Sequence, residues 1–178
     1  MNKTEININL DKEEKTSSEE TIRLEKLNKL KKEVPDAFKY NFDKTHNTQT
    51  IHSTFNTLET GEKNDTLIKL AGRLISKRNH GKAFFGNIQD SDGTIQIYAN
   101  LNALGEEKFN QLLSLDIGDI LGINGTPFKT KRGELSLKTS SYELLTKSLL
   151  PLPEKFHGLQ DIELRYRHRY IDLIANPT

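Results

Sequence analysis

The sequence predicts a mainly β protein with helices before, within and after its sheet. From residue 65 onward, five short stretches are rich in β-branched and aromatic residues and are separated by turn signals. A short stretch with apolar residues at helical spacing stands between the third and fourth of them. Three strands, a helix and two more strands are the order of a five-stranded OB-fold barrel, although other small barrels share parts of that order.

Each element of this barrel has its own signal. The turns are DSDG at residues 90–93 and KRG at residues 131–133, both typical turn sequences. The internal helix is expected at residues 106–115, with Phe109, Leu112 and Leu113 facing inward. We expect the strands at residues 66–77, 82–89, 94–100, 120–128 and 134–146.

The segments before the barrel are polar. Residues 1–16 are charge-rich and predict a disordered tail. Within residues 17–64 we expect a helix that begins at Ser17, whose spacing to Glu20 is that of a capping box, and that ends at Pro35. The rest of this region lacks a sustained period and predicts a loop with a short helix near residues 52–56.

Four domains follow from these boundaries. They are the tail at 1–16, the helix and loop at 17–64, the barrel at 65–147 and a terminal region at 148–178. The terminal region opens with LLPLP, which predicts a stiff linker, and continues with a predicted helix over residues 161–175. Apolar residues at helical spacing give that helix an apolar stripe.

Composition excludes several classes of protein. The chain has 178 residues, a net charge of +1 and no cysteine, so disulfides, thiol nucleophiles and cysteine-based zinc sites are excluded. It has no run of about 18 apolar residues, and no signal-peptide core at its start, so we expect a cytoplasmic protein that does not enter a membrane. Its five histidines lack the spacing of metal ligands, and no catalytic residue or phosphate-binding loop is identified.

The predicted hairpin of strands two and three combines positive charge with an aromatic residue. No acidic residue occurs over residues 71–89, which include Arg78 and Lys82. Strand alternation places Phe85 on the polar face together with Gln96. Cations that follow phosphates and aromatic rings that stack on unpaired bases are the two parts of a site for single-stranded nucleic acid.

Each of these residues also has a plainer interpretation. A lone Phe85 could pack under a loop, but the neighbouring cations favour a stacking role. Gln96 could be a solvated strand residue, or it could read a base edge with its donor and acceptor. Glu134 could balance the charge of Lys131 and Arg132 or accept a hydrogen bond from a base. Alternation alone leaves Glu134 open, and it leaves the direction of Arg78 open as well.

Longer motifs resemble one family. The stretches RLEKLNKLKKE, GKAFFGNIQDSDGTIQIY, LDIGDILGINGTPFKTKRGELSLKT and LPLPEKFHGLQDIELRYRHRYIDLIANP resemble the class II lysyl-tRNA synthetases. The last stretch resembles the junction between the anticodon-binding OB-fold and the catalytic domain of that family. The resemblance covers residues 20–178 and implies a module that binds the uridine-rich anticodon of lysine tRNA.

The resemblance also implies roles for single residues. Phe85 matches the aromatic that stacks on the central uridine, Gln96 and Arg78 match residues that bond to anticodon bases, and Glu134 matches an acid that contacts the same loop. Supporting contacts to the tRNA are expected from five cations, namely Lys26, Lys29, Lys82, Lys131 and Arg132.

The family's chemistry is the ATP-dependent charging of tRNA with lysine, which implies ATP and magnesium for the parent enzyme. This chain ends at Thr178, before the ATP-binding and lysine-binding motifs, so we expect it to be inactive alone, as a fragment or a stand-alone module without a cofactor. Any homodimer is expected to form through the missing catalytic domain. The alternatives are a non-specific single-strand binder, a structural domain, or an anticodon domain of the aspartyl or asparaginyl type.

Overall fold

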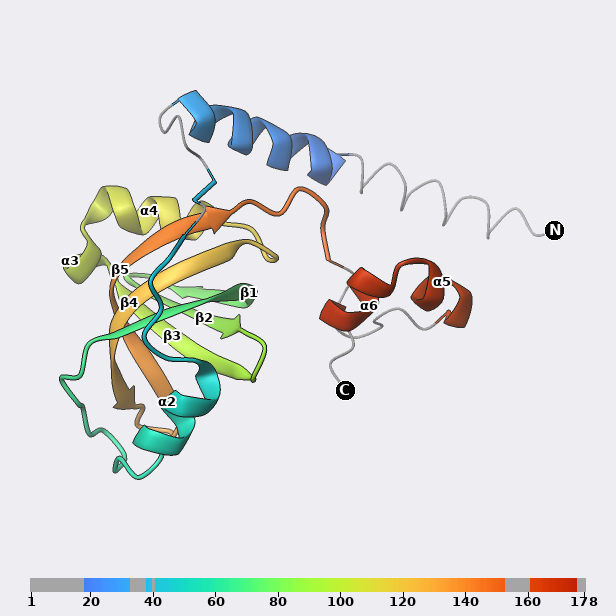
Figure 1. Ribbon diagram of the computed structural model, residues 1–178. Helices are drawn as coiled ribbons and strands as arrows, with labels where there is room; N and C mark the ends of the chain where they lie inside the picture. Colours follow the sequence, from blue (N-terminus) through green and yellow to red (C-terminus); the bar gives the residue numbers. More distant parts are fainter. Residues whose placement is uncertain (1–17, 33–37, 40, 153–160, 176–178) are drawn as a thin grey trace. The chain divides into compact units, whose positions relative to one another are not determined.

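The computed structural model describes residues 18–32, 38–39, 41–152 and 161–175 (Figure 1). The chain divides into two compact units, one formed by residues 25–148 and the other by residues 1–24 together with 149–178. The expected tail at residues 1–16 lies outside the described residues, and the expected division into four domains stays a prediction.

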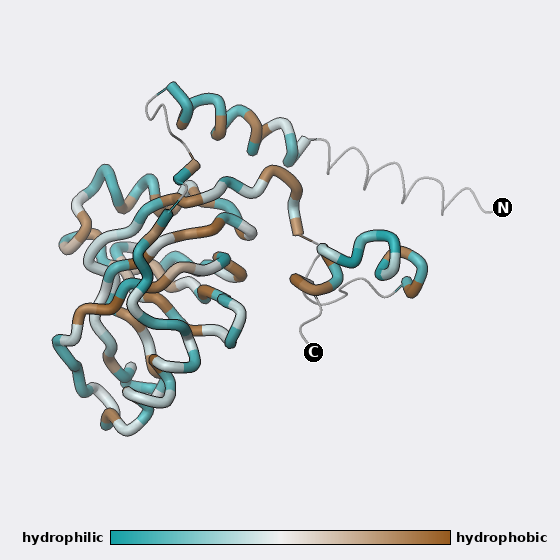
Figure 2. The backbone as a smooth tube through the Cα atoms, viewed as in Figure 1, coloured by the Kyte–Doolittle hydropathy of each residue, from teal (hydrophilic) through white to brown (hydrophobic). Residues whose placement is uncertain are grey.

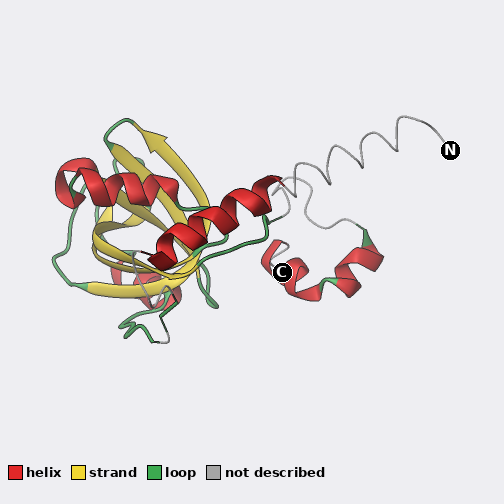
Figure 3. Ribbon diagram, turned by 90° about the horizontal axis from the view of Figure 1, so that it is seen from above, coloured by secondary structure: helices red, strands yellow, loops and turns green. Residues whose placement is uncertain are grey.

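The larger unit is built on five strands, and these follow the expected order closely. The strands are β1 (Ile68–His80), β2 (Ala83–Gln89), β3 (Thr94–Asn100), β4 (Ile120–Lys129) and β5 (Leu135–Thr146). They are hydrogen-bonded in the order β1-β2-β3-β5-β4, and β4 pairs back to β1, so the sheet closes on itself (Figure 3). The β3–β5 pair is parallel, whereas the other four pairs are antiparallel. The expected OB-fold is confirmed.

Three short helices accompany the sheet in Figure 1, with α2 (Thr48–Phe55) at one end and α3 (Leu101–Leu104) and α4 (Glu106–Ser114) at another. Helix α4 is the predicted internal helix. The short helix expected at residues 52–56 instead begins at Thr48, because the side chain of Asn47 caps it by accepting from the N–H of Thr50. Residues 18–32 are helical, and the expected start at Ser17 and end at Pro35 lie outside the described residues.

The core consists of aliphatic residues and three buried phenylalanines, of which Phe84 belongs to a strand. Apolar residues alternate with polar ones along the strands, as the banding of the tube in Figure 2 shows. On β2, Phe84 and Ile88 are almost fully buried while Phe85 and Asn87 between them are half-buried. On β3, Ile95, Ile97 and Ala99 are buried in the same way. The inward faces predicted by alternation are therefore confirmed for both strands.

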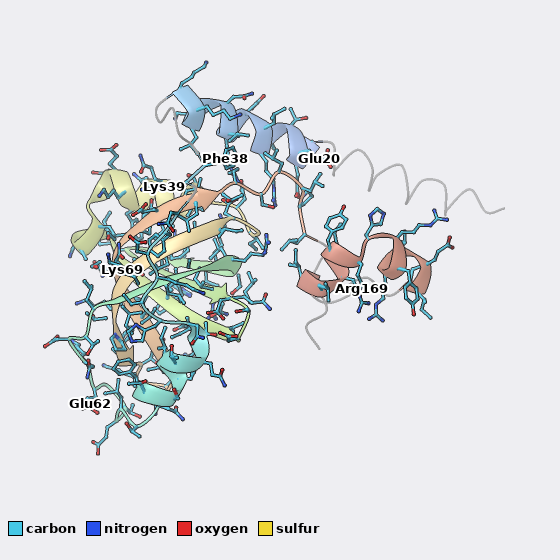
Figure 4. The ribbon with its side chains drawn as sticks, viewed as in Figure 1. Glu20, Phe38, Lys39, Glu62, Lys69 and Arg169 are labelled. Carbon is cyan, nitrogen blue, oxygen red and sulfur yellow. The ribbon has the colours of Figure 1, made fainter. Side chains whose placement is uncertain are left out.

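The segment that precedes α2 covers the side of the ring at β4. The N–H of Thr45 donates to the carbonyl of Lys69 on β1 at 2.9 Å, and Lys39 forms an ion pair with Glu143 on β5. Figure 4 labels Lys39 and Lys69 on this side. The ring of Phe42 lies directly over Gly122 of β4, where a Cβ atom would come within 2.4 Å of it. Only glycine leaves room for this close contact.

A buried ion network lies at the turn before β4. The ammonium of Lys147 contacts Asp119 at 2.8 Å and Asp116 at 2.5 Å, and the carboxylate of Asp119 also accepts the N–H of Ser148 at 2.8 Å. Lys26 reaches the other oxygen of Asp116 at 2.6 Å. Burial would raise the pKa of Asp116, but its hydrogen bonds from Lys147 and Lys26 and their charges outweigh burial and lower it.

Lys77 extends this network through backbone groups. Its ammonium donates to the carbonyl of Leu113 at 3.0 Å and to that of Leu115. Burial lowers the pKa of Lys77. A lysine of the predicted basic strand thus serves the fold by satisfying carbonyls near the end of α4.

The smaller unit contains α5 (Ile162–Arg167) and α6 (Arg169–Ala175). The single helix predicted over residues 161–175 was wrong, because the backbone leaves helical geometry at His168, with φ −116° and ψ 49°. Arg165 and Arg169 then converge on the carboxylate of Asp172, at 2.7 and 3.0 Å. No helix of the described residues is long and apolar enough to span a membrane.

A candidate nucleic-acid interface on the outward face of the ring

The strand register places the predicted site residues on one face. Arg78 pairs with Phe85, and Phe85 pairs with Tyr98, across β1, β2 and β3. Two residues further along β2, Asn87 pairs with Gln96. Directly paired residues point to the same side of a sheet, so these five side chains share the outward face of the ring. The face is called the β2–β3 face below.

The direction of Arg78, which alternation left open, follows from an irregularity in β1. The register of β1 against β2 shifts between Leu74 and Ser76. Such a bulge changes which residues face outward beyond it. β1 was also predicted to end at residue 77 and instead continues to His80, which extends the hairpin with β2. As a result, Arg78 lies beside Phe85 on the β2–β3 face.

Strand β5 completes this face from a distant part of the chain. Its parallel pairing sets Ser136 against Gln96 and Lys138 against Tyr98. Glu134 lies two residues before Ser136 and reaches the same side, where its carboxylate accepts a hydrogen bond from Gln96 Nε2 at 2.9 Å. Glu134 is thereby joined to the predicted site, which alternation alone could not decide.

Aromatic rings form a strip across the face. The ring of Phe85 lies 5.1 Å from that of Tyr98 and 6.1 Å from that of His80, measured between centroids. The ring of Tyr98 lies 5.8 Å from that of Phe128 on β4. Phe85, Tyr98 and Phe128 are each half-buried. Phe85 therefore packs against two neighbouring rings and keeps part of its surface exposed, where a base could stack.

Gln96 is not the solvated strand residue of the plainer interpretation. It is 6% exposed, and both ends of its side-chain amide are hydrogen-bonded. Its nitrogen donates to Glu134, and its oxygen accepts from the hydroxyl of Ser136 at 3.1 Å. A buried amide with both ends bonded has one orientation, and that orientation is a property the sequence does not reveal.

Cations stand at both ends of this face. Arg78 and Lys82 belong to the β1–β2 hairpin end, and Lys131 and Arg132 to the turn that precedes Glu134. All four are exposed, and none forms a hydrogen bond or ion pair through its side chain with another residue in the described ranges. Cations without internal partners are available to phosphates.

The turn before Glu134 is closed by its own hydrogen bonds. Thr130 and Glu134 bond through their main chains at 2.9 Å, and Gly133 takes a positive φ of 82° that favours glycine. The predicted turn is thus confirmed, and its hydrogen bonds fix the position of the Glu134 backbone.

The two supporting lysines of the helix at residues 18–32 differ. Lys29 is exposed, whereas the ammonium of Lys26 is taken by Asp116 and by the carbonyl of Ser114 at 3.1 Å. Their expected contacts with tRNA stay a prediction. No group of three or more His, Asp or Glu that could hold a metal ion occurs within the described part of the chain.

Sequence reasoning missed several residues of the face. It gave no role to Tyr98, and it selected neither Phe128 nor Ser136. Phe128 could have been found from the alternation of β4, but its contact with Tyr98 depends on how the ring closes. Ser136 carries no signal in the sequence, because its partner Gln96 is 40 residues away.

The comparisons with known proteins agree with this geometry. Residues 68–145 match the tRNA anticodon family, described as an OB-fold nucleic acid binding domain. The chain is 50% identical over 156 residues to a lysine--tRNA ligase of Carboxydothermus hydrogenoformans, which covers 88% of this chain and 31% of that protein. The lysine--tRNA ligase of Bacillus subtilis is 45% identical over 158 residues, covering 88% of this chain and 32% of the relative.

A third relative extends the match to nearly the whole chain. The lysine--tRNA ligase of Syntrophomonas wolfei is 46% identical over 177 residues, which is 99% of this chain and 33% of that protein. The resemblance found in the sequence motifs is thus confirmed, and the chain spans about a third of the length of the curated relatives it matches.

Proposed function

We propose that this chain, whose ring of strands is an OB-fold of the tRNA anticodon type and whose curated relatives are lysine--tRNA ligases, binds the anticodon loop of lysine tRNA. The observation that carries the proposal is the β2–β3 face itself. It carries a half-buried Phe85 on the same side of the sheet as the bonded pair of Gln96 and Glu134, and cations stand at both ends. RNA loops are read by stacking and bonding of unpaired bases, which these groups can perform.

The groups divide the work by their chemistry. Phe85 stacks on a base of any identity, because every base has a π-face. Gln96 and Glu134 make directional hydrogen bonds, so they carry the preference for uridine at the centre of the anticodon. Arg78 is adjacent to Phe85 and bonds to the bases of the loop, while Lys82, Lys131 and Arg132 hold phosphates. This binding uses side chains alone and needs no cofactor.

A non-specific single-strand binder on the same face is the competing proposal. It would use the same aromatic strip and the same cations, and it would show a similar dependence on salt. The two proposals differ in the role of the Gln96–Glu134 pair, which a non-specific binder does not need. The discriminating quantity is therefore the ratio of affinities for two loops that differ only in the central base.

The test is a titration of the chain with two anticodon stem-loops that carry either U or C at the central position. We expect the U-centred loop to bind more tightly, and Gln96→Ala to bring the ratio of the two dissociation constants close to one. Gln111→Ala is the matched control, because Gln111 is an exposed amide on α4. Equal affinity of the unmutated chain for both loops would support the non-specific binder instead.

A further inference from the structure

Ser136 is fully buried although it lies on the outward side of β5. Its exposed fraction is 0%, and its hydroxyl lies 3.1 Å from the amide oxygen of Gln96. The carbonyl of Glu134 lies 3.3 Å from the same hydroxyl, so one hydroxyl hydrogen is shared between two acceptors. The parallel β3–β5 pairing sets Ser136 directly against Gln96.

The hydrogen bonds around Gln96 define which end of its amide faces which neighbour. A carboxylate can only accept, so Glu134 requires the amide nitrogen of Gln96. The opposite end of the amide is then the oxygen, and it requires a donor, which Ser136 supplies. Without that hydroxyl, the buried oxygen would have no partner among the described residues, and the amide would lose half of what orients it.

We infer that Ser136 is a positioning residue that orients the Gln96 amide so that the interface reads uridine. The inference rests on the proposed function. The amide nitrogen has two hydrogens, of which one is donated to Glu134 and the other is left for a base. Gln96 and Glu134 therefore present a donor next to an acceptor. Uridine carries the complementary acceptor O4 next to the donor N3–H.

Cytosine carries the opposite arrangement on the same edge. Its N4 amino group is a donor and its N3 an acceptor, so a donor faces the donor of Gln96 and an acceptor faces the carboxylate of Glu134. A rotated Gln96 amide would offer its oxygen instead, which suits the amino group of cytosine. The orientation that Ser136 maintains is thus the orientation that favours uridine.

A purely structural role for Ser136 predicts a different result. In that case its removal would lower the free energy of unfolding and weaken both loops alike. The informative measurement is therefore the ratio of the affinities for U- and C-centred stem-loops, together with urea unfolding of each variant as a measure of folding. The full chain is used throughout.

The experiment compares Ser136→Ala with the unmutated chain. The loss of one neutral hydrogen bond is expected to lower the preference for the U-centred loop by about 2- to 10-fold. In a chain that already carries Gln96→Ala, Ser136→Ala should leave the ratio unchanged, because Ser136 acts through Gln96. Ser140→Ala is the control, since that exposed serine donates instead to the carbonyl of Asn124.

The outcomes separate the inference from the proposed function. An unmutated chain that prefers uridine, combined with a Ser136→Ala variant that keeps the full preference, overturns the inference alone. A change of the ratio by Ser136→Ala in the Gln96→Ala background also overturns it, because Ser136 would then act by another route. An unmutated chain with no preference removes the proposed function and the inference with it.

Discussion

The ion network before β4 and the β2–β3 face use the same kinds of charged residue in opposite ways. In the network, Lys147 and Asp119 have side chains that are 4% and 0% exposed, and each is bonded. At the ends of the face, Arg78 and Lys82 are exposed and bond to no other residue within the described ranges. The difference teaches that burial and pairing, rather than residue type, separate a cation that holds the fold from one that is free to bind.

The physical reason is that a buried charge costs much more free energy than a charge that stays in water. A charge taken out of water needs a partner with good geometry, and removal of that partner leaves an uncompensated buried charge. A charge that stays in water has little effect on stability, so it can be kept for a ligand. Substitutions in the two regions should therefore affect different measurements.

The largest expected effect is on stability, from Lys147→Ala. The substitution leaves the fully buried carboxylate of Asp119 without its ammonium partner. We expect the free energy of unfolding to fall by about 3–5 kcal/mol, as is found when one member of a buried ion pair is removed. Urea unfolding measures this, with Lys138→Ala as the control because Lys138 is exposed on the outward face of β5. If Lys147→Ala and Lys138→Ala unfold with the same free energy, the buried ion network does not stabilise the fold more than an exposed lysine does.

The next effect is on binding, from Phe85→Ala. Loss of stacking weakens binding by about 1–3 kcal/mol per base, which corresponds to roughly 5- to 150-fold. Because stacking is indifferent to base identity, the U-centred and C-centred loops should be weakened by similar factors. Phe85→Tyr keeps an aromatic ring and should bind nearly as the unmutated chain does. If Phe85→Ala binds the U-centred loop without loss, Phe85 is a packing residue.

The smallest effect is expected from Lys82→Ala. Its ammonium would contact only phosphate, so the ratio of affinities for the two loops should not change. The slope of log K against log salt concentration should become shallower by about 1, because one fewer counterion is released. Titrations at several salt concentrations measure the slope, and the free energy of unfolding should stay within about 0.5 kcal/mol. A changed preference for the U-centred over the C-centred loop would mean that Lys82 contacts the central base rather than a phosphate.

Local pattern was enough for most of the sheet. The strand at residues 94–100 and the turn at Gly133 were predicted as observed, because alternation and turn chemistry are local properties. The break between α5 and α6 was missed, since a helical period continues through His168 while the backbone departs from helical geometry there. The register shift between Leu74 and Ser76 could not be located from the sequence, which left the direction of Arg78 open, because a bulge depends on the partner strand.

The candidate site was also predictable only as far as local alternation reaches. Phe85 and Gln96 were chosen from alternation, since both lie on one hairpin. The burial of Gln96 and its bond to Glu134 depend on β5, whose pairing with β3 is parallel and joins residues 40 apart. Pairings of this kind are set by how the whole ring closes, and a strand pattern does not encode them.

The ring closes at its shortest seam, where β3 meets β5 through three pairs of residues. During synthesis the edge of β3 stays open until β5 has been made, and Gln96, Ser136 and Glu134 come together only at that moment. A base held between Phe85 and Glu134 would lie across this seam, so bound RNA would resist its opening by mass action. A bound RNA loop would therefore stabilise the β3–β5 pairing, which is the last pairing of the ring that can form during synthesis.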